Sequence, residues 1–167
     1  LGKGWKTFWS PSCKTTKFGI SSGALVAVQK DIDAWPPKGG ENLYPGRLAA
    51  CIIGLPGCED MAILSGYLKT GGGRDATSVK VMDTAKEFIA DWGKTFVIGA
   101  DVQQHPTKFG ELPFLADCDA VLRGDPDMPS FVSGSTSSWL DTIMVARKLD
   151  PLTSQARTVL ESALPKH

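Results

Sequence analysis

Residues 96–106 read FVIGADVQQHP, and this stretch decides how the chain is interpreted. Its first three residues are aromatic or β-branched and lie between turn-forming segments, which predicts a strand buried on both faces. Asp101 follows two small residues, where the chain would leave the sheet and where layered α/β proteins commonly place their sites. A carboxylate at such a position either caps a turn or takes part in chemistry, and the residues alone leave both open.

The charges of this 167-residue chain balance, with eighteen basic and eighteen acidic residues. A net charge of zero argues against a protein that holds nucleic acid mainly by a strongly positive surface, although a local basic patch is compatible with it. A chain of this length buries roughly two-thirds of its unfolded surface and needs neither a disulfide nor a structural metal to fold. No apolar stretch approaches the roughly 20 residues that a bilayer-spanning helix requires.

The four cysteines do not form a zinc-binding pattern, because none are spaced C-x-x-C and only two histidines accompany them. We interpret them as reduced thiols. Cys51 lies in an apolar run and is expected to be buried, whereas Cys58 follows Pro-Gly in a turn. A disulfide between any pair stays open at this point.

Short apolar runs predict strands along most of the chain. Residues 4–9 alternate aromatic and polar side chains, which is typical of a half-exposed strand near a sheet edge. Pro56 and Gly57 predict a hairpin turn between two antiparallel strands. The Pro- and Gly-rich residues 35–40 predict a long surface loop. The expected strands cover residues 4–9, 24–28, 48–53, 61–67, 96–98, 120–122, 140–145 and 156–160.

One long helix is expected over residues 77–92, because apolar side chains recur there at three- and four-residue spacing. Asp75 or Thr77 can cap its start, and Gly93 is placed to end it. A shorter helix is expected over residues 109–115. Strands, one long helix and then more strands predict an α/β sandwich built mainly on antiparallel sheets, because a strict βαβ repeat needs a helix between each strand pair.

Several segments, in chain order, resemble the endonuclease/exonuclease/phosphatase family of metal-dependent phosphodiesterases, which includes abasic-site and retroelement endonucleases. Residues 99–106 match the family's G-G-D-F-N-x-x-P segment as G-x-D-x-Q-x-x-P. Residues 19–28, 62–67, 137–145 and 164–167 resemble its Gly-rich strand, its Tyr-ending strand, its S-x-R-I-D-Y-V-L-V strand and its terminal S-D-H. The resemblance implies a two-layer β-sandwich flanked by helices, as four α/β/β/α layers in one domain over residues 1–167 that lacks the family's first strands.

The resemblance also implies roles for five residues, Asp101, Gln103, Asp141, His167 and Tyr67. Asp101 would generate or orient the nucleophile, and Asp141 would orient His167, which helps to activate water and stabilises the phosphate. Gln103 stands at the family's Asn and carries its amide about one carbon-carbon bond further from the backbone. It either keeps that role or satisfies loop backbone. Tyr67 would face the phosphate or be a buried structural Tyr.

Other positions depart from the family pattern. Lys166 replaces an Asp that contributes to the metal site, which reverses the local charge, and Trp139 replaces a common Arg. The metal-binding Glu of the family would lie upstream of Leu1. We therefore assign no metal ligands, although the family uses Mg²⁺ or Mn²⁺. His105, before Pro106, is expected to be a solvated turn residue.

Two functions from different classes remain. The first is a divergent, incomplete relative of metal-dependent phosphodiesterases, acting on nucleic acid or another phosphodiester with weak or no catalysis. The second is a catalytically dead scaffold or accessory subunit of a larger protein assembly, in which Trp5 and Trp9 are buried against a protein partner. Neither reading specifies a cellular compartment.

Overall fold

The computed structural model describes residues 4–14, 20–69, 75–123, 127, 129–133 and 136–153. Strands are the commonest regular element in these residues, and one long helix interrupts their succession. The strands are β1 (Trp5–Ser10), β2 (Cys13–Lys14), β3 (Ile20–Ser21), β4 (Ala24–Gln29), β5 (Asp33–Trp35), β6 (Asn42–Tyr44), β7 (Leu48–Gly54), β8 (Met61–Tyr67), β9 (Thr95–Asp101), β10 (Ala120–Leu122), β11 (Phe131–Ser133), β12 (Thr136–Ser138) and β13 (Asp141–Ala146). The helices are α1 (Ala76–Trp92), α2 (Pro106–Gly110), α3 (Pro113–Asp117) and a 3₁₀ helix, η1 (Arg147–Leu152).

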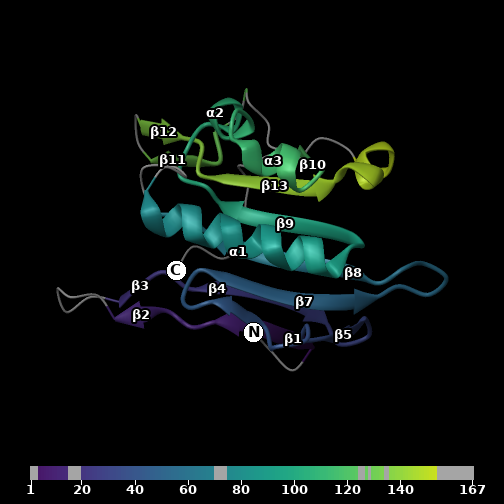
Figure 1. The fold of residues 1–167 in the computed structure, drawn as a ribbon. Helices are drawn as coiled ribbons and strands as arrows, with labels where there is room; N and C mark the ends of the chain where they lie inside the picture. Colours follow the sequence, from purple (N-terminus) through teal and green to yellow (C-terminus); the bar gives the residue numbers. More distant parts are fainter. Residues whose placement is uncertain are drawn as a thin grey trace.

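A seven-stranded mixed sheet forms the centre of the fold (Figure 1). Its strands follow the order β10-β13-β9-β8-β7-β5, and β6 also pairs with β7. The β8–β9 pair is parallel because α1 connects the two strands as a crossover, whereas the other pairs are antiparallel. β9 therefore lies inside the sheet, between β8 and β13.

A second, two-stranded sheet of β1 and β4 packs against β7 and β8. Alternate side chains of β1 and β4 point toward the larger sheet, as the two-residue period of a strand requires. Between the sheets lies an apolar cluster of Phe8, Val26, Val28, Cys51 and Ile53. The predicted α/β sandwich is confirmed.

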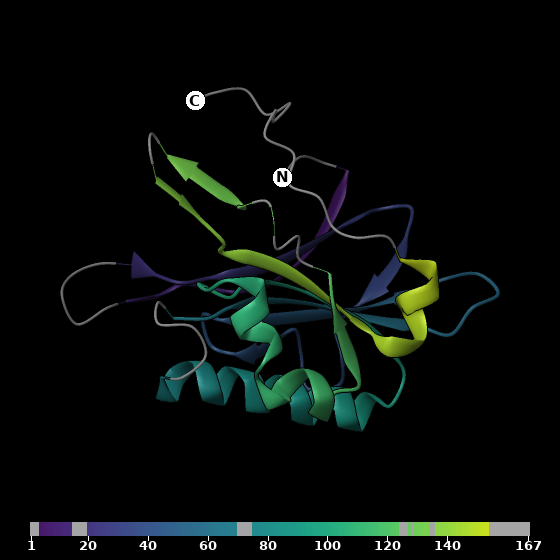
Figure 2. The same cartoon turned by 90° about the horizontal axis from the view of Figure 1, so that it is seen from above.

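The opposite face of the large sheet is covered by α1, α2 and α3 (Figure 2). Asp75 caps α1 by accepting from the backbone N–H groups of Thr77 and Ser78, at 3.0 and 3.3 Å. Gly93 ends the helix in the left-handed conformation at φ 63°. The apolar stripe of α1 and the rings of Phe109 and Phe114 fill the space above the sheet. In the described part of the chain, these three helices all lie on this face.

Three local predictions are corrected or untested. The loop expected over residues 35–40 begins only after Trp35, which ends β5; it joins β5 to β6, and both are three-residue strands that pair with β7. The helix expected over residues 109–115 is two short helices, because Pro113 lacks a backbone N–H and starts α3 instead of continuing α2. The strand expected over residues 156–160 lies outside the described residues.

The four cysteines are free thiols, as predicted, with Cys51 and Cys118 buried. Burial raises the pKa of each buried thiol to about 11, so both stay protonated at neutral pH. They are therefore poor nucleophiles and belong to the core.

Among the helices that the structure describes, none combines the length and apolar character needed to cross a bilayer.

Candidate functional site

Tyr67, Asp101 and Asp141 form one row across three adjacent strands. In the register of the sheet, Asp101 on β9 pairs with Tyr67 on β8 and with Asp141 on β13. Residues directly opposite each other on neighbouring strands have their side chains on the same face, with Cβ atoms roughly 4.5–5.5 Å apart in antiparallel pairs. The structure thus brings three of the five expected site residues together at one edge of the sheet.

Gln103 joins this row from the loop after β9. Its side-chain nitrogen Nε2 donates to both carboxylate oxygens of Asp101, at 2.6 and 2.7 Å. The sequence left open whether Gln103 would bond to loop backbone instead. In the structure its amide nitrogen bonds to the Asp101 carboxylate. The loop itself is fixed by Leu140, whose carbonyl accepts from the backbone N–H groups of Val102 and Gln103 at 2.6 and 3.2 Å.

The carboxyl of Asp101 is partly buried, and its electrostatic surroundings favour the protonated form. Burial raises its pKa above the ordinary range, and the neighbouring charge of Asp141 raises it further. The hydrogen bonds from Gln103 act in the opposite direction, because they stabilise the ionised carboxylate. Asp141 itself is exposed.

Arg47 extends the row beyond Tyr67. Its guanidinium carbon lies 5.2 Å from the centre of the Tyr67 ring, and its Nη1 donates to the Tyr67 carbonyl at 3.3 Å. The backbone N–H of Tyr67 donates to the Arg47 carbonyl at 2.8 Å. No role for Arg47 was expected from the sequence. The sequence did contain a signal for this contact. Arg47 directly precedes the strand expected over residues 48–53, and the antiparallel partner of that strand ends at Tyr67, so the hairpin brings the two residues together.

The sequence suggested that His105 is a solvated turn residue, and the structure corrects this. Its Nδ1 accepts from the backbone N–H of Thr107 at 3.2 Å and caps α2, and the ring is partly buried. The rings of His105 and Trp139 lie with their centres 4.6 Å apart, tilted by 53°. This contact joins the loop that carries Gln103 to the segment that leads into Asp141, so it helps to position both.

Ser130 also positions the start of β13. Its hydroxyl oxygen accepts from the backbone N–H groups of Leu140 and Asp141, at 2.8 and 2.9 Å. Two backbone donors are thus satisfied by one side chain at the point where the row begins. His167 and Lys166 lie outside the described residues, so the pairing of Asp141 with His167 stays a prediction.

The described residues do not fit a divalent cation at this edge. Mg²⁺ takes oxygen ligands in near-octahedral geometry, commonly one or two carboxylates with waters and substrate phosphates. Both oxygens of Asp101 already accept from an amide nitrogen, which is a donor and cannot ligate a cation as an oxygen would. Within the described ranges, no three His, Cys, Asp or Glu side chains gather as a metal site.

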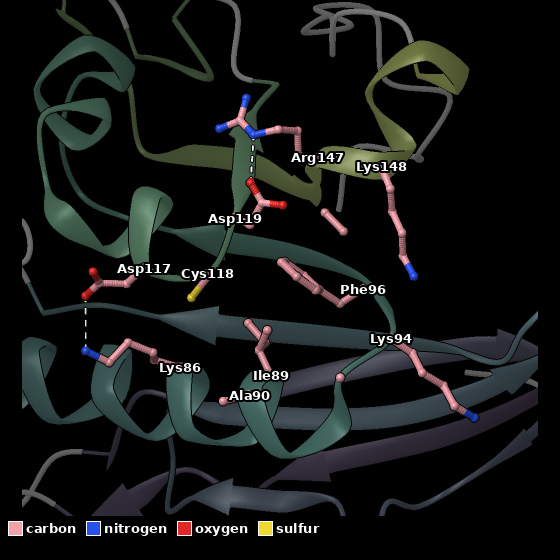
Figure 3. Close-up of a pocket in the computed structure, with 12 residues that line it drawn as sticks. Lys86, Ile89, Ala90, Lys94, Phe96, Asp117, Cys118, Asp119, Arg147 and Lys148 are labelled. Carbon is pink, nitrogen blue, oxygen red and sulfur yellow. Dashed lines mark hydrogen bonds and ion pairs between the residues drawn. The ribbon is translucent and has the colours of Figure 1, made fainter.

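A groove of about 340 Å³ lies at the other end of β9, beside Phe96, the second residue of the strand (Figure 3). The groove is bounded by α1, the end of α3 and the junction of β13 with η1. Lys86 pairs with Asp117 at 3.1 Å and Arg147 with Asp119 at 2.7 Å, and Figure 3 shows both pairs. Because these cations already have carboxylate partners and Asp101 ends the strand on the opposite side, we do not place the site here.

No family model matches the sequence, and no curated protein matches it. Solved structures do. The endonuclease domain of TRAS1, a telomere-specific non-LTR retrotransposon, aligns with a TM-score of 0.67 at 15% identity, over 90% of this chain and 71% of that domain. The human Nocturnin catalytic domain, solved with a bound sulfate anion, aligns with a TM-score of 0.58 at 12% identity, over 86% of this chain and 61% of that chain.

The 3′-5′ exonuclease NExo from Neisseria meningitidis aligns with a TM-score of 0.50 at 14% identity, over 89% of this chain and 69% of that chain. The chain therefore has the fold of endonuclease/exonuclease/phosphatase proteins, and the resemblance found in the sequence is confirmed at the level of the fold. It spans 61–71% of the length of these three structures.

Proposed function

We propose that this chain is a divergent relative of metal-dependent phosphodiesterases that keeps part of their site and hydrolyses phosphodiesters slowly in this form. The observation that carries the proposal is the row of Tyr67, Asp101 and Asp141 in register across β8, β9 and β13. The fold it shares with an endonuclease domain supports nucleic acid as the phosphodiester.

In this proposal Asp101 accepts the proton of the attacking water. A base works best when its pKa lies near the working pH, and burial shifts the pKa of Asp101 in that direction. The Gln103 amide orients the carboxylate through its two hydrogen bonds. Asp141 lies beside Asp101 and tunes its charge.

In this proposal Arg47 and Tyr67 contact the phosphate at the other end of the row. A guanidinium stabilises the charge that develops on phosphate oxygens. Because the described residues do not fit a divalent metal ion, the stabilisation of this charge depends on the Arg47 guanidinium alone, which also contacts Tyr67. We expect slow turnover for this reason.

The test is cleavage of end-labelled single-stranded and duplex DNA and RNA oligonucleotides by the full chain, with EDTA, Mg²⁺ or Mn²⁺. We expect slow cleavage in at least one condition and a loss of about a hundredfold in Asp101→Asn. Asp91→Asn, an exposed carboxylate on α1, is the matched control and should cleave like the parent. Cleavage that Asp101→Asn leaves unchanged contradicts the proposal, and so does an inert parent chain.

A second function, a scaffold or accessory subunit, is favoured by the outer face of the β1–β4 sheet. Trp5, Trp9 and Leu25 are 40%, 57% and 47% exposed, and Trp9 pairs with Leu25 in the ladder. Adjacent exposed apolar side chains of this size are typical of a surface that binds another protein. Sedimentation velocity of the parent chain and of Trp9→Ser, both in complete cellular fractions, tests this second function. A parent that sediments as part of an assembly, together with a Trp9→Ser variant that does not, supports it. A parent that sediments as a monomer contradicts it.

A further inference from the structure

The amide nitrogen of Gln103 sits in the position that a chelated cation would take on Asp101. Its distances to the two carboxylate oxygens are 2.6 and 2.7 Å, so it lies nearly midway between them. A cation bound by both oxygens of one carboxylate occupies this same midline. The nitrogen is therefore a neutral replacement for the ion, and both cannot be present.

The length of the Gln side chain makes this contact reachable. Residue 103 adopts a left-handed backbone conformation at φ 55°, and its N–H donates to the Leu140 carbonyl. The chain turns back at this point, and the side chain spans the distance to a carboxylate two residues earlier. Asn at the same position is one methylene shorter, so its nitrogen cannot take the same place on an unchanged backbone.

The charges of the row explain why something must occupy the midline. Asp101 and Asp141 are paired in register on neighbouring strands, so their two carboxylates lie close together on the same face of the sheet. Two neighbouring carboxylates are stabilised by a proton, a cation or hydrogen-bond donors. Here the described partner of Asp101 is the Gln103 amide, whereas Asp141 is an exposed residue.

We propose that Gln103 excludes divalent cations from Asp101, and that removing its amide opens a site for Mg²⁺ or Mn²⁺ between Asp101 and Asp141. The inference rests on the proposed function, because Asp101 is the carboxylate that acts on the phosphodiester there. One or two carboxylates with water are sufficient protein ligands for such an ion. A single side chain then determines whether this edge of the sheet is metal-free.

The experiment titrates Mn²⁺ alone, without substrate, into the full chain and follows binding by calorimetry and by the Mn²⁺ electron paramagnetic resonance signal. We expect Gln103→Ala and Gln103→Asn to bind Mn²⁺ at least about tenfold more tightly than the parent chain. Gln29→Ala, an exposed glutamine on β4, is the matched control and should bind like the parent. The double variant Asp101→Asn with Gln103→Ala should lose the gain.

Equal affinity in the parent, Gln103→Ala and Gln103→Asn overturns the inference, as does a gain that persists in the double variant. Weaker binding in both Gln103 variants also overturns it, because Gln103 would then support the ion. Since the measurement contains no phosphodiester, its outcome is separate from cleavage. Tighter Mn²⁺ binding by a chain that never cleaves ends the proposed function alone, whereas cleavage with unchanged Mn²⁺ binding ends this inference alone.

Discussion

Asp101 and Asp141 are direct partners in the antiparallel ladder between β9 and β13. Asp101 is partly buried and Asp141 is exposed; burial raises the pKa of Asp101, and the neighbouring charge of Asp141 raises it further. This asymmetry gives each carboxylate a different character, and it leads to predictions that do not depend on any catalytic activity.

The pKa of Asp101 should move in opposite directions in two variants. Asp141→Asn removes a neighbouring negative charge and lowers it, whereas Gln103→Ala removes two hydrogen bonds to the ionised form and raises it. Side-chain carboxyl chemical shifts followed by NMR through a pH titration measure both. Movement in the same direction in the two variants is incompatible with these causes.

The free energy of unfolding of the parent chain, measured relative to that of Asp101→Asn, should be larger in acid than at neutral pH. A pKa that is raised on folding means that the folded state binds the proton more tightly, so this contribution is present below the unfolded pKa of about 3.9 and is lost as the pH rises through the folded value. Urea unfolding of both chains across this window gives the difference. A difference that grows with pH in favour of the parent refutes the assignment.

The α1 cap should be sensitive to acid in the opposite sense. Asp75 accepts from two backbone N–H groups and from the Ser78 hydroxyl, which lowers its pKa. Asp75→Ala should cost about 1 kcal/mol at neutral pH. The contribution of the parent carboxylate is present above its unfolded pKa and lost as the pH falls through the folded one. Asp75→Asn, which caps without ionising, should keep its stability in acid.

Phe109 should carry most of the anchoring of α2. Its side chain is 1% exposed and lies against Phe114, with ring centres 6.4 Å apart. Phe109→Ala should lower the free energy of unfolding by about 3–5 kcal/mol, since it removes a buried ring and leaves a cavity. Phe109→Leu should cost clearly less. Denaturant unfolding followed by far-UV circular dichroism compares them, and equal losses contradict a packing role.

Gly46 should tolerate no side chain. Its φ is 72°, and a Cβ there would lie 2.8 Å from both Cys13 Sγ and Ser22 Oγ. Gly46→Ala should therefore cost more than the roughly 1 kcal/mol of backbone strain alone. Gly39→Ala is the control, because Gly39 also has a positive φ of 97° but nothing lies within 4 Å of its Cβ. Thermal unfolding should place Gly46→Ala well below Gly39→Ala.

Local signals were enough to predict the central elements. The uninterrupted apolar run before Asp101, the three- and four-residue spacing of α1 and its Gly93 end, and the Pro-Gly hairpin each depend on neighbours in sequence. They fix element type through backbone preference and burial period. The site residues were expected from the family resemblance, and the register of β8, β9 and β13 brings Tyr67, Asp101 and Asp141 together in one row.

Long-range geometry accounts for what was missed. Arg47 reaches Tyr67 through the register of β7 and β8, and His105 meets Trp139 through the contact of two loops distant in sequence. β5 and β6 are three residues long and gain their strand character from pairing with β7, so they have no independent pattern. The contact of Gln103 with Asp101 depends on a left-handed residue whose side chain turns back. Residue type alone does not specify that conformation.

The strand that carries Asp101 pairs with a neighbour on each side, whereas the residue that contacts its carboxylate lies on a loop. Amide protons of a strand that pairs on both sides exchange slowly with solvent, so Asp101 ends a strand that we expect to open rarely. Gln103 stands outside that ladder, on a loop. A substitution at residue 103 can therefore change which group contacts the Asp101 carboxylate without altering the strand pairing that holds Asp101 in place.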